Sequence, residues 1–71
     1  MQINEKLKLI RFVKGLNKKQ FAELTGVAQS TITRYESGER TPDYSFLENL
    51  VREFNVNPMY LFDKSEDIFL K

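Results

Sequence analysis

The most chemically distinctive stretch of the sequence is residues 26–38, GVAQSTITRYESG, which is crowded with hydrogen-bonding side chains. If it is placed on a helix of 3.6 residues per turn, Ile32 and Tyr35 fall on one side and the polar residues share the other. The residues on this polar side are Gln29, Ser30, Thr33, Arg34 and Ser37. Amide, hydroxyl and guanidinium groups of this size suit the edges of DNA bases, so the segment predicts recognition rather than catalysis.

The same stretch is a weak helix former, because Ser, Thr and Ile all have low helix propensity. A strand is the alternative, but strict alternation fails at Gln29–Ser30 and again at Arg34–Tyr35. A face that served only solubility would be rich in Lys and Glu. The composition of the segment therefore favours a helix whose polar side contacts a partner.

Composition excludes several classes of protein. The sequence has 71 residues, which fits one domain or one piece of a longer chain, and it has no Cys and no His. Disulfides, zinc fingers and the usual nucleophile–base pairs are therefore excluded, and we expect no enzyme, no catalytic residue, no metal and no cofactor. No run of residues is apolar enough to span a membrane, no signal peptide opens the chain, and no small-molecule site is evident, which together predict a cytoplasmic protein.

Charge is distributed unevenly along the chain. The whole sequence carries only +1, but residues 1–41 have eight basic against four acidic residues, and residues 42–71 have three against six. The first part is therefore net +4 and the second net −3. Such a dipolar domain either offers one face to an anionic partner or has a solvated surface with chance asymmetry.

The first half of the chain predicts two short helices. An amphipathic helix over residues 3–14, capped by Gly15, is predicted by apolar residues at spacings of four and three, namely Ile3, Leu7, Ile10 and Val13. Asn17 and Gln20 form a capping-box pattern that opens a second helix, which runs to residue 24 or 25 with Phe21 and Leu24 facing inward. Gly26 then follows as a turn residue.

The second half predicts two more helices after the polar segment. Asp43 suits the N-cap of a helix with a strong apolar stripe between residues 46 and 54, and Asn55 suits its end. Asn57 and Pro58 suit the start of a last, short helix. We therefore expect an all-α domain of five short helices without a strand.

Six residues between positions 21 and 35 complete a recognisable motif. The pattern F-A-x(3)-G-V-x(4)-I-x(2)-Y provides a small residue where two helices cross, a glycine turn and apolar residues that hold the second helix. Its residues are Phe21, Ala22, Gly26, Val27, Ile32 and Tyr35. With Arg11 before it, YESG after it and two further helices, the chain closely resembles the XRE family of Cro and phage-repressor regulators over roughly residues 5–62.

The resemblance implies a compact, lambda-repressor-like domain over residues 1–62, with the helix-turn-helix formed by the second and third helices. The positions that read bases in the family correspond here to Gln29, Ser30, Thr33 and Arg34. The positions that contact phosphates correspond to Asn17, Lys18, Ser37 and Arg40. The resemblance also implies a buried ion pair between Arg11 and Glu36.

Two residues depart from the family pattern. Ala28 stands where the family often has Ser or Thr as the N-cap of the third helix, and the missing cap costs about 1 kcal/mol. Glu39 adds a negative charge near the expected DNA face, where it either weakens non-specific binding or contacts a cytosine amino group.

The tail, residues 63–71, ends in an apolar run that a small protein should not leave in water. It either packs on the domain's own core, joins a dimer interface, or leads as a linker into a further domain. The residues considered for a dimer interface are Tyr60, Leu61, Phe62, Ile68, Phe69 and Leu70.

The expected function is sequence-specific binding of a double-stranded, palindromic DNA operator by a homodimer, in a transcriptional regulator that most often acts as a repressor. The alternative is an antitoxin-type protein-interaction module that uses its acidic half or its tail to hold a protein, with DNA binding secondary.

Overall fold

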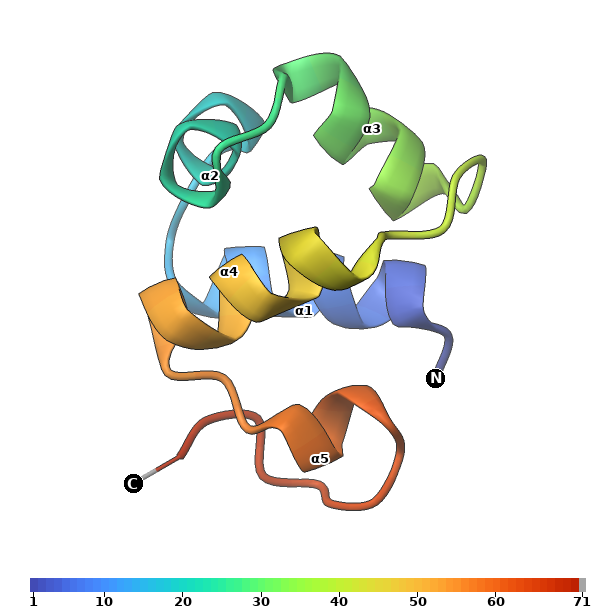
Figure 1. The fold of residues 1–71 in the computed structure, drawn as a ribbon, viewed down its shortest axis with the longest axis vertical. Coiled ribbons are helices and arrows are strands. Elements are labelled where there is room, and N and C mark those ends of the chain that lie inside the picture. The colour runs from blue at the N-terminus through green and yellow to red at the C-terminus, as the bar shows by residue number, and fades with distance from the viewer. Residues whose placement is uncertain (71) are drawn as a thin grey trace.

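The computed structural model describes residues 1–70, which fold into five α-helices (Figure 1). The helices are α1 (Ile3–Val13), α2 (Lys18–Thr25), α3 (Gln29–Ser37), α4 (Tyr44–Phe54) and α5 (Pro58–Leu61). Within these residues the β pairing is limited to one isolated antiparallel bridge between Val56 and Phe69. The expected all-α architecture is confirmed.

Side chains at the helix starts satisfy backbone N–H groups that would otherwise lack partners. At α2, the Asn17 side chain accepts from the Gln20 N–H at 2.8 Å, and the Gln20 side chain accepts from the Asn17 N–H at 2.9 Å. At α4, Asp43 accepts from the N–H of Phe46 at 2.9 Å. These local contacts fix where both helices begin, and both starts are as predicted.

The turn between α2 and α3 depends on Gly26. Its φ is +77°, in the left-handed region, and its N–H donates to the Ala22 carbonyl at 2.9 Å. A side chain there would strain the backbone, although the space beside it is open. The left-handed residue ends α2 and redirects the chain into α3.

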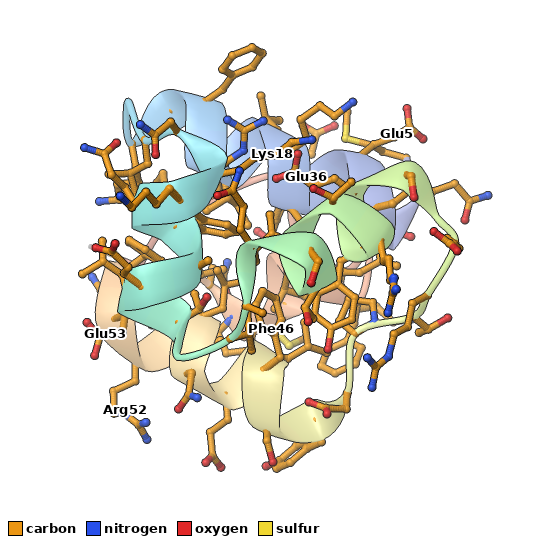
Figure 2. All side chains as sticks on the ribbon, turned by 90° about the horizontal axis from the view of Figure 1, so that it is seen from above. Glu5, Lys18, Glu36, Phe46, Arg52 and Glu53 are labelled. Carbon is orange, nitrogen blue, oxygen red and sulfur yellow. The ribbon has the colours of Figure 1, made fainter. Side chains whose placement is uncertain are left out.

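The core lies between the α2–α3 pair and the two helices that pass beneath it, α1 and α4 (Figures 1 and 2). The ring of Phe46 on α4 is 4.8 Å from that of Tyr35 and 6.3 Å from that of Phe21, measured between centroids. Phe54 stacks on Phe21 at 5.5 Å. The complete set of buried apolar residues is Leu7, Ile10, Phe21, Ala22, Ile32, Tyr35, Phe46, Leu50, Phe54, Val56 and Tyr60.

Two inward-facing predictions need correction. Leu24 is 46 % exposed, because the buried stripe of α2 runs through Phe21, Ala22 and Thr25. Val13, expected on the apolar stripe of the first helix, is 55 % exposed at the last position of α1.

The tail returns along the end of α4. The Asn57 N–H donates to the Ile68 carbonyl at 2.8 Å, and the Leu70 N–H donates to the Asn55 carbonyl at 2.9 Å. Ile68 and Phe69 are half-buried against the core. The tail is therefore held to the core through Ile68 and Phe69, whereas Leu70 is 47 % exposed. Lys71, the last residue of the predicted tail, lies outside the described residues.

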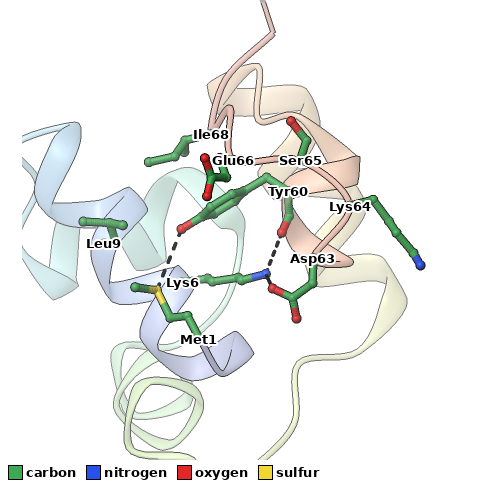
Figure 3. Close-up of a pocket in the computed structure, with 9 residues that line it drawn as sticks. All are labelled: Met1, Lys6, Leu9, Tyr60, Asp63, Lys64, Ser65, Glu66 and Ile68. Carbon is green, nitrogen blue, oxygen red and sulfur yellow. Dashed lines mark hydrogen bonds and ion pairs between the residues drawn. The ribbon is translucent and has the colours of Figure 1, made fainter.

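A buried lysine holds the tail to α1 (Figure 3). Lys6 is only 3 % exposed, and its Nζ donates to the Tyr60 carbonyl at 2.6 Å and to the Asp63 carboxylate. The ammonium also lies 4.9 Å from the centroid of the Tyr60 ring. The lysine thus satisfies a carbonyl at the end of α5 and fixes where the tail begins.

Candidate nucleic-acid interface

The two helices of the motif form one end of the molecule, at the top of Figure 1. On α3, Ile32, Tyr35 and Glu36 are buried. The opposite side of the same helix presents exposed side chains, namely Gln29, Ser30, Thr33 and Arg34. The structure therefore brings all four predicted base-reading residues to one outward surface, which we call the α3 face.

The predicted phosphate-contacting residues flank the α3 face. Asn17 and Lys18 lie at the start of α2, which Figure 2 shows beside α3 at the near end of the molecule. Ser37 ends α3, and Arg40 follows in the loop to α4. Lys18 is half-buried, and the other three are exposed.

Local contacts orient two of these flanking residues. The Ser37 hydroxyl donates to the Arg34 carbonyl at 3.1 Å and accepts from the Glu39 N–H at 3.3 Å. The Arg40 guanidinium lies 5.9 Å from the centroid of the Tyr35 ring, a cation–π distance. Arg40 is thus placed close to the end of α3, whereas nothing in the structure explains the acidic side chain of Glu39.

The start of α3 lacks the side-chain cap that α2 and α4 have. Ala28 occupies the N-cap position with extended backbone (φ −74°, ψ 152°) and has no side-chain acceptor. Its carbonyl accepts from Thr31 and Ile32, at 3.0 and 3.3 Å. The backbone geometry of a cap is therefore present without its hydrogen-bonding side chain.

A buried ion pair joins the far end of α3 to α1. Arg11 Nε donates to Glu36 Oε2 at 2.8 Å, and Arg11 Nη2 donates to Oε1 at 3.0 Å. The exposed fractions of the two side chains are 12 % and 3 %. Arg11 Nη1 also donates to the Leu16 carbonyl at 3.1 Å, so the same guanidinium holds the loop before α2. Arg11 thereby neutralises the negative charge of Glu36, which lies on the buried side of α3 and not on the α3 face.

A second feature, which the sequence did not indicate, lies at the other end of the molecule. A hollow of about 620 Å³ opens between the start of α1 and the α5 tail (Figure 3). Its walls combine apolar side chains such as Leu9 and Ile68 with the charged groups of Lys6, Asp63 and Glu66. Lys6 and Asp63 already pair with each other, so both charges are used inside the protein.

Residues 1–70 contain no group of three or more His, Cys, Asp or Glu side chains arranged to hold a metal ion. None of the helices in this part of the chain has the length and apolar character that crossing a membrane requires.

Two helices joined by a glycine turn, the second buried on one side and polar on the other, define a helix-turn-helix domain. The sequence profile of the helix-turn-helix domain family matches residues 4–66. The chain belongs to this family, in its XRE branch of phage-repressor-like regulators.

Similar proteins support this assignment. The chain is 40 % identical over 50 residues to repressor protein C of Escherichia phage P2, covering 70 % of the chain and 50 % of that protein. It is 34 % identical over 70 residues to the transcriptional activator BcrR of Enterococcus faecalis, covering 99 % of the chain and 34 % of that protein. The chain thus spans half or less of these two relatives.

A solved structure shares the fold. The P22 c2 repressor protein, in complex with a synthetic operator, superposes with a TM-score of 0.80 at 20 % identity. The superposition covers 92 % of this chain and 98 % of that one. The five-helix, lambda-repressor-like architecture is confirmed.

Proposed function

We propose that this chain is the DNA-binding part of a transcriptional regulator, and that α3 reads base edges in the major groove of a palindromic operator. The observation that carries the proposal is the two-sided character of α3. Its apolar side is fully used by the core, while its polar side is exposed at one end of the molecule. The relatives named as a repressor and an activator are consistent with regulation of transcription.

The exposed residues of α3 suit direct readout. The Arg34 guanidinium matches the O6 and N7 acceptors of guanine, and the Gln29 amide matches the N6 and N7 pattern of adenine. Ser30 accepts or donates, and Thr33 adds a methyl group for contact with thymine. Together they provide the mixture of donors, acceptors and apolar surface that distinguishes one base pair from another.

The flanking residues suit the phosphate backbone. At the start of α2, the Asn17 side chain accepts from the Gln20 N–H, but the N–H groups of Lys18 and Lys19 have no acceptor within the helix. These two N–H groups can therefore donate to a phosphate. Beyond the end of α3, Arg40 would contact the backbone of the same groove. The Ser37 hydroxyl would do so by turning its O–H from the Arg34 carbonyl to a phosphate oxygen. Phosphate contacts at both ends would set the register of α3 without specifying sequence.

A regulator of this kind acts by occupying its site rather than by chemistry. We place it in the cytoplasm, as a homodimer on DNA whose two α3 helices read half-sites about one helical turn apart. Repression follows where the operator overlaps a promoter. Because one relative is a named activator, the sign of regulation depends on the operator's position and on any further domain.

Selection from a pool of random duplex DNA at physiological salt tests the proposal directly. We expect a palindromic consensus, and we expect Arg34→Ala to lose selectivity at one position in each half-site. Lys64→Ala, at the opposite end of the molecule, removes a cation without altering the consensus and serves as the control. Failure to select any sequence would overturn the proposal, and capture of a protein partner by the acidic half would then favour the antitoxin-type alternative.

A further inference from the structure

The last carbonyl groups of α3 need donors from outside the helix, because the chain leaves the helical path before it can supply them. The Arg34 carbonyl accepts from the Arg40 N–H at 3.2 Å, and the Tyr35 carbonyl accepts from the Gly38 N–H at 3.3 Å. Both donors belong to the segment that directly follows the helix. The loop over residues 38–40 is therefore folded back on the end of α3.

The next carbonyl of α3, that of Glu36, accepts from a distant part of the chain. The Asn4 side chain, in the first turn of α1, donates through Nδ2 to this carbonyl at 3.3 Å. Figure 2 shows the start of α1, where Glu5 is labelled, beside the end of α3, where Glu36 is labelled. Within residues 1–70 the Glu36 carbonyl has no other hydrogen-bond donor. Asn4 thus caps the end of α3 from a neighbouring helix.

The Asn4 side chain also lies against the turn that follows α3. Gly38 has a φ of +82°, in the left-handed region, and a β carbon at this position would lie 3.6 Å from Asn4 Nδ2. This is an ordinary van der Waals distance, so the half-buried Asn4 amide packs directly on the turn. The turn lies between Ser37 and Arg40, the two predicted phosphate contacts at this end of α3.

Asn4 and Arg11 hold different parts of Glu36. They are seven positions apart, about two turns of α1, and therefore lie on the same side of that helix. Arg11 binds the side-chain carboxylate of Glu36, whereas Asn4 binds its main-chain carbonyl. Loss of the Asn4 amide therefore leaves the ion pair in place and removes only the contact with the backbone.

We propose that Asn4 is a positioning residue for the phosphate contact of Arg40. By holding the Glu36 carbonyl and packing on the turn at Gly38, its amide fixes the loop that carries the Arg40 guanidinium. Asn4 acts through this loop and not by touching DNA itself. Its role rests on the proposed function, because the loop has to be held in place only where α3 is docked on a duplex.

Asn4→Leu provides the test, because leucine has nearly the shape of asparagine and donates no hydrogen bond. Binding is measured to two duplexes of equal length, one carrying the selected operator and one with its sequence scrambled. We expect binding to both to weaken about threefold, because a phosphate contact carries no sequence information. In the free variant, amide exchange at Gly38 and Arg40 should be about threefold faster than in wild type.

A double-mutant cycle with Arg40→Ala separates positioning from a general loss of stability. Arg40→Ala alone should weaken binding to both duplexes about tenfold. Because Asn4 acts through Arg40, adding Asn4→Leu to Arg40→Ala should weaken binding no further. In the cycle of Asn4→Leu with Lys18→Ala the two effects should multiply, since Lys18 lies at the start of α2.

Asn49→Leu is the matched control. Asn49, on α4, makes a similar contact at the end of α2, where its Nδ2 donates to the Thr25 carbonyl at 3.4 Å. The same change is thus made at the same kind of contact, away from the loop after α3, and we expect no coupling with Arg40→Ala. Urea unfolding of every variant gives the folded fraction, by which each binding constant is corrected.

Three results would overturn the inference. If Asn4→Leu bound both duplexes as tightly as wild type, or if its effect multiplied with that of Arg40→Ala, Asn4 would not position the Arg40 contact. A loss confined to the operator would place the effect of Asn4 on the α3 face instead. Wild type that bound neither duplex would refute the proposed function and this inference with it, a result distinct from the other two.

Discussion

Arg11 and Glu36 meet through two parallel hydrogen bonds, of 2.8 and 3.0 Å, although they are 25 residues apart in sequence. Donation to the Glu36 carboxylate raises the pKa of the Arg11 guanidinium above its ordinary value, so Arg11 remains charged at all ordinary pH. It attaches the last turn of α3 to α1, at the end of α3 opposite the uncapped start. The orientation of the α3 face therefore depends on this contact.

Removing one partner of the pair should destabilise the fold strongly. We expect Arg11→Met to lower the free energy of unfolding by about 3 kcal/mol, because it leaves the Glu36 carboxylate buried without a partner. Urea unfolding at pH 7 measures the loss. The double variant Arg11→Met with Glu36→Leu should recover most of it, and a double variant as unstable as the single would show that the buried charge is not the cause.

Restoring the missing cap should stabilise α3. Ala28→Ser adds an acceptor for the N–H of Ser30 or Thr31 at a residue whose backbone is already extended. We expect a gain of about 1 kcal/mol and slower amide exchange in residues 29–36, relative to α4. Ala28→Val, which adds volume without an acceptor, is the control and should give no gain.

Arg34→Ala should affect which sequence is bound. The loss of a bidentate contact to guanine should cost about 1–3 kcal/mol on the selected operator and much less on non-specific DNA. Titration of both DNAs measures the difference. If the variant bound all sequences as well as wild type does, Arg34 would not be a base-reading residue.

Lys18→Ala should act differently, because a phosphate contact carries no sequence information. We expect weaker binding to every DNA by a similar factor, and a smaller slope of log binding constant against log salt, by about one for each protomer. Measurements between low and physiological salt give the slope. An unchanged slope would indicate that Lys18 is a solvated surface lysine.

The Lys6–Asp63 contact should make stability depend on pH in the acidic range. The hydrogen bond from Lys6 lowers the pKa of Asp63 below its ordinary value of about 4. The contact therefore contributes fully above that value and is lost as the pH falls through the lowered pKa. Asp63→Asn should be less stable than wild type at pH 7, and the difference should shrink in acid.

Asp67→Asn serves as the control for this comparison, since it removes another acid of the tail that does not pair with Lys6. It should leave the pH profile of unfolding unchanged. If the difference in unfolding free energy between wild type and Asp63→Asn stayed constant down to the lowest pH, titration of the Asp63 carboxylate would not be its cause.

The helices were predictable because their signals are local. Asn17 with Gln20, and Asp43 at the start of α4, act on N–H groups within three residues, so the sequence alone specifies them. The burial of Lys6 was not predictable in this way. It depends on the Tyr60 carbonyl and Asp63, which lie more than fifty residues away in sequence.

The α3 face was predictable for a related reason, since helical periodicity alone separates its polar residues from Ile32 and Tyr35. Its placement at the exposed end of the molecule was not, because packing of α1 and α2 against α3 decides it. Leu24 shows the limit of periodicity. The sequence allowed α2 to bury either Leu24 or its neighbour Thr25. In the structure Thr25 is the buried residue, and its carbonyl accepts from the Asn49 side chain of α4.

The division of α3 into a buried and an exposed side has an evolutionary consequence. The side chains of Gln29, Ser30, Thr33 and Arg34 are exposed, so substitutions other than Gly and Pro should each change stability by no more than about 0.5 kcal/mol. New combinations at these positions could accumulate without unfolding the protein. A library randomised at the four positions with Gly and Pro left out should therefore remain largely folded, and the scaffold is suited to the directed evolution of new specificities.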